Sequence, residues 1–272
     1  MKSKYFLQAV FYLSLISSTS LYAAGEAKVI KHETSDKTIF QVVSKIDPFV
    51  DNLIKQASDY LTSAKSFSLR TEVTVEEVMA SGQKIQLSRS GEILIRHPDR
   101  MHVEVTSDNG VIRLYFDGTK LSRFDLDKNI FASIDAPGTL EAALDHAMKK
   151  YHVDAPLADL LAGNPYENYI ANTDEGFYAG LHYLEGKEYH HLALSNENVD
   201  YQVWIADGPA PLFRKIVITY KHLPGAPQFT AELSDWDFNP RTPDLAFDFY
   251  PPIDAEQIEF LPVTVSKSGV KK

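Results

Sequence analysis

Apolar and polar residues alternate through the block from residue 91 to residue 125. Every second position is apolar over its first two segments, at Ile93, Ile95, Met101, Val103 and Val105. Alternation with a period of two indicates antiparallel strands with one buried face. Tight-turn sequences follow at residues 108–110 (Asp-Asn-Gly) and 117–118 (Asp-Gly). The block therefore predicts an antiparallel meander whose apolar face covers something.

Short segments of the same kind continue on both sides of this block. We expect strands at about residues 67–78, 84–96, 101–107, 111–116, 121–126 and 129–134, and again at 176–184, 188–196, 201–205, 212–220 and 228–239. Such spacing is typical of a sandwich, a barrel or a strongly curved sheet. Because hairpins join most strands and strands do not alternate with helices, we predict one continuous antiparallel sheet in a mainly β, α+β fold.

Three helices are predicted, and we expect them to pack on one face of the sheet. Asp47 is a good N-cap, Pro48 suits the first helical position, and apolar residues follow at helical spacing as far as Ala64. Thr139 is the expected cap of a second helix that reaches residue 150. Pro156 starts a short third helix through residue 161.

Residues 1–24 have the layout of a secretory signal peptide. Lys2 and Lys4 precede an uncharged, mostly apolar run that ends in small residues. An uncleaved anchor is the alternative, because the run is just long enough to cross a bilayer. The chain has no cysteine, which excludes a lipoprotein and a disulfide scaffold. We expect a periplasmic protein with no stable membrane insertion after signal cleavage.

The rest of the chain divides into an arm, a domain and a tail. Residues 25–45 are polar, with a short strand expected at 38–43, and residues 263–272 form a polar tail. Residues 46–262 are enough for a single domain with its own core. The formal net charge of −10 argues against nucleic-acid binding and against docking on anionic membranes through a basic patch.

Common catalytic motifs are missing from the sequence. It contains no G-x-S-x-G, no Walker loop and no H-E-x-x-H. Ser81 and Lys84 match S-x-x-K, and residues 267–269 weakly match the K-T-G of penicillin-binding enzymes. The first pair lies on a predicted hairpin turn and the second motif in the tail. We therefore predict no catalytic residue, and an enzyme, such as a hydrolase, is the least favoured class.

No metal or cofactor site is predicted either. Residues 125–129 begin like a calcium loop, but Ile130 and Ala136 stand where that loop needs Gly and a bidentate Glu. We interpret the segment as a polar β-turn. His190 and His191 are adjacent in a strand, so they point to opposite faces and cannot bind one metal together.

Large aromatic residues occur in nearly every predicted strand, among them Phe124, Tyr201, Trp204, Phe213 and Phe229. A core filled by its own side chains is one interpretation. A curved sheet that does not close can instead stay partly hollow and hold a ligand. The pattern is compatible with both.

Residues 91–100, 116–121 and 124–125 resemble the early strands of the periplasmic lipoprotein carriers LolA and LolB. A longer resemblance is to a bacterial domain-of-unknown-function family of predicted periplasmic proteins related to these carriers. Its motifs stand at residues 137–140, 156–161, 190–192, 204–208, 214–220 and 233–236. The resemblance implies an incomplete β-barrel, which is a strongly curved antiparallel sheet with helices packed on its concave apolar face.

One position departs from the carrier pattern. LolA has an arginine directly before the proline, and that arginine is implicated in controlling its lid. This chain has His97 there and Arg96 one place earlier, on the opposite face of the strand. One hypothesis is that a histidine at this place donates a pH-sensitive hydrogen bond to a helix carbonyl.

These observations favour an exported, non-enzymatic binding protein that holds the acyl chain of a lipid or of an acylated protein. An envelope sensor or scaffold that binds a protein partner is the alternative. The expected cavity lining is Ile93, Ile95, Met101, Val103, Leu114, Phe116, Phe124, Trp204, Ile216, Ile218, Phe229 and Leu233. The expected lid or gating residues are Arg96, His97, Leu53 and Leu144.

Overall fold

The computed structural model describes residues 45–151, 155 and 157–260. The expected signal peptide, nearly all of the polar arm with its short strand, Pro156 and the C-terminal tail lie outside the described residues.

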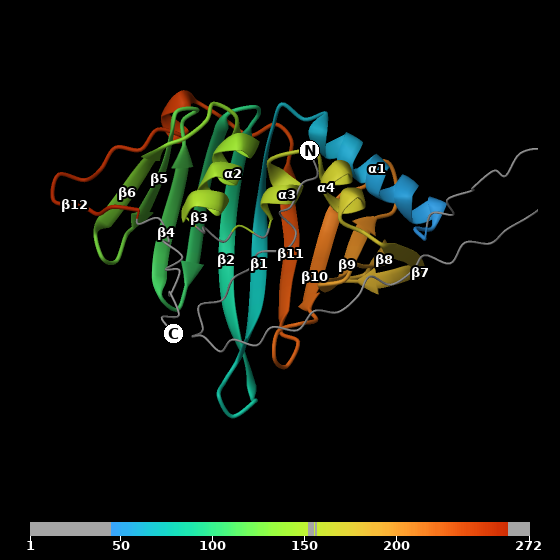
Figure 1. Cartoon of the computed structure of the whole chain (residues 1–272). Coiled ribbons are helices and arrows are strands. Elements are labelled where there is room, and N and C mark those ends of the chain that lie inside the picture. Colours follow the sequence, from blue (N-terminus) through green and yellow to red (C-terminus); the bar gives the residue numbers. More distant parts are fainter. Residues whose placement is uncertain (1–44, 152–154, 156, 261–272) are drawn as a thin grey trace, which may run out of the picture.

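A single open sheet runs through the described chain (Figure 1). Its spatial order is β12-β6-β5-β4-β3-β2-β1-β11-β10-β9-β8-β7. The strands are β1 (Ser66–Val78), β2 (Lys84–Arg96), β3 (Arg100–Ser107), β4 (Gly110–Phe116), β5 (Lys120–Asp125), β6 (Ile130–Asp135), β7 (Glu175–Leu184), β8 (Lys187–Ser195), β9 (Val199–Ala206), β10 (Phe213–Tyr220), β11 (Gln228–Asp237) and β12 (Glu256–Gln257). The mainly β, curved-sheet prediction is confirmed, with one correction. The sheet is not wholly antiparallel, because β12 pairs in parallel with β6.

Two meanders make up this sheet. Strands β1 to β6 form one and β7 to β11 form the other, and they join where β1 pairs with β11. The last strand of the first meander and the first strand of the second therefore lie near opposite edges. The chain between them must cross the sheet, and it carries α2 (Leu140–Tyr151), α3 (Ala158–Leu161) and α4 (Pro165–Ala171) over the concave face (Figure 1).

The helices begin where the sequence supplies caps. In α1 (Pro48–Thr62) the Asp47 carboxylate accepts a hydrogen bond from the backbone N–H of Phe49 at 2.8 Å. Thr139 caps α2 in the same way, as predicted, through the backbone N–H of Ala142 at 3.2 Å. Helix α4 was not predicted, although Asn164 and Pro165 repeat the cap-and-proline signature of α1.

The segment after β11 packs on the convex face of the first meander. Phe249 contacts Tyr115, Phe124 and Phe131, with ring centroids 5.4, 5.7 and 5.4 Å away. The backbone of Asp254 then accepts a hydrogen bond from Asn129 before β12 pairs with β6. We call residues 238–260 the strap. It covers the convex face there as the helices cover the concave one.

The turn between β5 and β6 is the polar turn that the sequence predicted. Asp125 is only 2% exposed, and it accepts hydrogen bonds from the backbone and the ammonium group of Lys128 at 3.1 and 2.7 Å. The side-chain hydrogen bond from Lys128 outweighs burial, and with the nearby charge of Arg123 it holds the pKa of Asp125 below its ordinary value.

Asp125→Asn should destabilise the protein at neutral pH and lose that effect in acid. The folded pKa lies below the unfolded value of about 3.9, so the carboxylate stabilises the fold above that value. The contribution is lost as the pH falls through the folded pKa. Urea unfolding of both proteins from about pH 7 toward about pH 2 should show the difference in unfolding free energy shrinking. A difference that stays constant over this range would contradict the assignment.

Candidate binding cavity

A cavity of about 370 Å³ lies between the concave face of the first meander and the helices α2 and α3. Strands β1 to β4 supply most of its floor, with Tyr220 of β10 and Phe229 of β11, and the two helices and the segment before α3 supply its roof. The apolar side chains that line it include Val73, Val75, Ile93, Ile95, Met101, Val103, Val105, Leu114, Leu140, Leu144, Leu157, Leu161 and Phe229. The polar part of the lining, together with one glycine, comes from Thr71, Arg89, Ser90, Gly91 and Tyr220.

The cavity has a deep end and a mouth. Ile95, Met101 and Leu140 are almost fully buried, at 1%, 5% and 0% exposure. Along β2, in steps of two residues, burial decreases from Ile95 to Arg89, which is exposed. The mouth therefore faces the end of the sheet that carries the β1–β2 hairpin.

On the concave side of the second meander, aromatic side chains pack in the core. Tyr201 is 1% exposed and donates its hydroxyl to the backbone oxygen of Tyr169 at 3.2 Å. The Tyr169 ring in turn stacks with Phe213 at 6.2 Å between centroids. The concave side of the sheet thus carries both packed core residues and a cavity.

The structure brings half of the predicted lining residues to the cavity wall. These are Ile93, Ile95, Met101, Val103, Leu114 and Phe229. A further four, Phe116, Ile216, Ile218 and Leu233, face the same side but belong to the filled core.

Phe124 and Trp204 lie on the convex face, so their expected place in the cavity is wrong. Phe124 pairs across the ladder with Arg113, and Leu121 is the β5 residue that points into the core. The Trp204 ring stacks on His191 at 4.0 Å and packs with Val217. A strand alternates its faces residue by residue, so large size alone does not reveal the inward side.

Several lining residues were missed. Thr71, Val73 and Val75 share a face of β1 with Phe67 and Leu69, which are buried, so their alternation in the sequence was a usable signal. The helix residues Leu140, Leu157 and Leu161 were recognised as helical but not as the roof.

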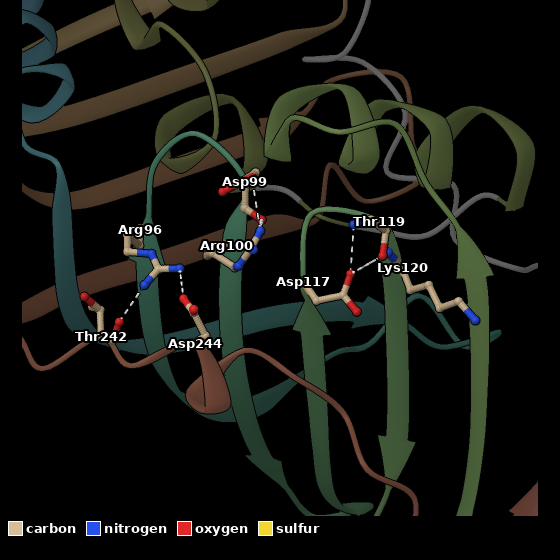
Figure 2. Close-up of polar contacts among 8 residues, drawn as sticks. All are labelled: Arg96, Asp99, Arg100, Asp117, Thr119, Lys120, Thr242 and Asp244. Atoms are coloured by element: carbon tan, nitrogen blue, oxygen red, sulfur yellow. Dashed lines mark hydrogen bonds and ion pairs between the residues drawn. The ribbon is translucent and has the colours of Figure 1, made fainter.

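The four predicted lid or gating residues have different surroundings. Leu144 lies in the cavity roof, whereas Leu53 packs in the core cluster and does not line the cavity. Arg96 points to the convex face, where it donates to the backbone oxygen of Thr242 at 2.7 Å and pairs with Asp244 (Figure 2). Its role is to hold the strap.

His97 also differs from the sequence-based hypothesis. It precedes a cis proline, its ring contacts Phe67 at 5.7 Å, and it forms no hydrogen bond with any other described side chain or helix carbonyl. Burial holds the pKa of its imidazole below the ordinary value. The start of α2 is instead held by a backbone hydrogen bond, which the N–H of Leu140 donates to the carbonyl of Pro98 at 2.8 Å.

Polar contacts fix the neighbouring turns at this end of the sheet (Figure 2). Asp117 accepts from the backbone and hydroxyl of Thr119 and from the backbone of Lys120, at 2.8, 2.7 and 2.8 Å. Asp99 pairs with Arg100 at 3.0 Å. These contacts therefore hold the turns at the end of the sheet where α2 begins.

The described residues contain no cluster that could hold a metal ion. No group of three or more His, Cys, Asp or Glu side chains converges within them. Ser81 accepts a hydrogen bond from the backbone of Gln83 in the predicted turn, while Lys84 pairs with Glu76. His190 contacts Tyr178 and Asp207 on one face, and His191 contacts His182 and Gln202 on the other.

A family model described as "predicted periplasmic protein (DUF2092)" matches residues 50–261, and the chain belongs to this family. The family is described as periplasmic, which agrees with the location expected from the sequence. No helix among the described residues is long and apolar enough to span a bilayer.

No curated protein matches the chain. Among solved structures, it is similar to the lipoprotein LppX of Mycobacterium tuberculosis, at 13% identity and a TM-score of 0.48, over 72% of this chain and 98% of that one. LprF of Mycobacterium bovis has 12% identity and a TM-score of 0.43, over 77% and 98% of the two chains. A LolA superfamily protein of Nitrosomonas europaea has 12% identity and a TM-score of 0.34, over 73% and 96%.

Two leucine truncations should distinguish the filled core from the hollow part. Leu233→Ala removes a side chain that is 0% exposed within the filled core, and it should cost about 2–5 kcal/mol. Leu114→Ala enlarges a space that already exists, and it should cost about 1 kcal/mol. The midpoints and slopes of urea unfolding give the change in unfolding free energy for both variants. Equal losses would show that the cavity wall packs as tightly as the core.

Proposed function

We propose that this protein is a non-enzymatic periplasmic binding protein that holds an acyl chain in the cavity under α2 and α3. The observation that carries the proposal is the apolar space of about 370 Å³ on the concave face of the sheet. This volume lies at the lower end of the range for small-molecule pockets, roughly 300–1,000 Å³. It favours one chain of a lipid or of an acylated protein.

The apolar lining is sufficient to retain such a ligand. Burying one methylene contributes roughly 0.8 kcal/mol, so a chain with about ten buried methylenes gains roughly 8 kcal/mol before the cost of association. Burial alone therefore supports useful affinity.

The first experiment is native mass spectrometry of the mature protein, purified from its own compartment without detergent, with lipid analysis of an organic extract. A stoichiometric adduct with the mass of an acyl compound is the expected result. A bare protein that stays bare after incubation with lipids and acylated peptides would overturn the proposal.

A second candidate function, binding of an envelope protein, is favoured by the β7 edge. Phe177, Leu181 and Tyr183 on this edge strand are 63%, 48% and 70% exposed. Leu181 and Tyr183 pair with His190 and Glu188 on one face of the sheet, and Phe177 pairs with Ala193 on the other face. Exposed large apolar side chains are a common feature of interaction surfaces. A bare protein in the experiment above, together with a captured periplasmic partner that Tyr183→Ser releases, would favour this function.

Val103→Trp should abolish binding of a fluorescent fatty acid, because the indole would occupy the cavity that Val103 lines. Thr106→Trp is the matched control, since Thr106 lies on the same strand, is exposed and points to the opposite face. We expect at least a ten-fold rise in Kd for the first variant and no change for the second. Circular dichroism and thermal melting check that both are folded. Unchanged affinity in a folded Val103→Trp protein would place the ligand elsewhere.

A further inference from the structure

Arg89 is a cation at the mouth of the cavity. It pairs across the ladder with Val73 on β1 and with Ser107 on β3. It therefore shares the concave face with Gly91 and Ile93, and it lines the cavity although most of its neighbours there are apolar.

The guanidinium of Arg89 has no ion pair or hydrogen bond with a described residue. Among the other arginines of this region, Arg70, Arg96, Arg100, Arg113 and Arg214 each pair with a carboxylate. Glu77 faces the same side further along β1, and Asp127 accepts a hydrogen bond from Val111. Neither carboxylate lies within ion-pair distance of Arg89, so the positive charge of Arg89 is available at the cavity mouth.

A second polar group lies deeper on the same wall. Thr71 lines the cavity, is only 4% exposed, and its hydroxyl has no hydrogen-bond partner among the described residues. It stands opposite Gly91, where an added Cβ would lie 2.5 Å from the Thr71 hydroxyl oxygen. The glycine thus leaves room for this hydroxyl on the cavity floor. The Thr71 hydroxyl is not among the fully buried unpartnered atoms of the described residues, so it keeps accessible surface on the cavity floor that a ligand atom can reach.

The two groups can contact one headgroup. Thr71 faces Gly91 and Val73 faces Arg89, so Thr71 and Arg89 are diagonal neighbours on one face of the β1–β2 ladder. Arg89 is nearer the mouth, and the apolar wall continues from Thr71 toward Ile95 and Met101. A ligand with its oxygen-rich end at this pair and its chain at the deep end matches the polarity of the wall.

We propose that the ligand is an acyl amphiphile with an anionic oxygen headgroup, a carboxylate or a phosphate, which Arg89 and Thr71 bind at the cavity mouth. The proposal rests on the function proposed above. Guanidinium groups bind carboxylates and phosphates through parallel hydrogen bonds, and a hydroxyl donates one more. The net charge of −10 disfavours approach to an anionic bilayer, but it is screened beyond roughly 8–10 Å at physiological salt and leaves this local contact intact.

The test compares three ligands with one chain length, namely dodecanoate, dodecyl phosphate and dodecanol. Each competes with a bound fluorescent fatty acid on the delipidated mature protein. The wild type should bind both anions about ten-fold more tightly than the alcohol, which is the ratio that about 1.4 kcal/mol of headgroup interaction gives. The affinities for dodecanoate and dodecyl phosphate, compared with each other, then distinguish a fatty-acid-like from a phospholipid-like headgroup.

Variants assign that preference to the two residues. Arg89→Gln should reduce the preference for anions to about two-fold or less and leave dodecanol affinity unchanged. Arg89→Lys should keep part of it, and Thr71→Val should weaken the anions several-fold. Arg70→Gln is the matched control, because it removes the same charge from the exposed, opposite face of β1 and should change nothing. Thermal melting confirms that each variant is folded.

The outcomes separate the two proposals. If the wild type binds none of the three ligands, the acyl-binding function itself fails. If it binds all three equally, or if Arg89→Gln keeps the full preference, the headgroup assignment is overturned while acyl binding stands. Increasing salt should weaken the preference in the wild type and in Arg70→Gln but not in Arg89→Gln.

Discussion

The pairing of β1 with β11 is the constraint on which the rest of the structure depends. It joins two meanders in the middle of the sheet. The chain therefore leaves the first meander near one edge and must enter the second at the other. A connection of this length cannot run through the sheet, so it crosses one face, and the curvature of the sheet makes the concave face the shorter path. The helices of this crossover are amphipathic because their inner side meets apolar strands.

The same crossover places different kinds of side chain over the two meanders. Over the second meander, α1 and α4 lie against aromatic residues, and Tyr169 on α4 reaches Tyr201 and Phe213 directly. Over the first meander the helices carry leucines and alanines, and the floor carries mainly aliphatic side chains, with a threonine and a glycine among them. The side chains of roof and floor do not meet everywhere, and the space between them is apolar and open at one end.

Much of this fold could be predicted from the sequence, because it is encoded locally. Period-two alternation located most strands, and the caps at Asp47 and Thr139 located α1 and α2. The parallel pairing of β12 could not be foreseen from two residues that carry no alternation. Helix α4 was missed although its cap and proline were visible, since a helix of this length has little periodicity of its own. Which aromatic residues point inward depends on register, and that is why Phe124 and Trp204 were misplaced. The void itself is a property of how distant elements meet, and single residues do not reveal it.

The two edges of the sheet end differently. On one side β12 continues the ladder in parallel beside β6, and the strap holds it there. On the other side, Ile46 bridges to Gly176 at the start of β7, and further along, the register shift between Tyr178 and Gly180 interrupts the strand. Bulges of this kind make an edge a poor template for an added strand. A molecule that docks at β7 would therefore have to be recognised through the exposed side chains of Phe177, Leu181 and Tyr183 rather than by extending the sheet.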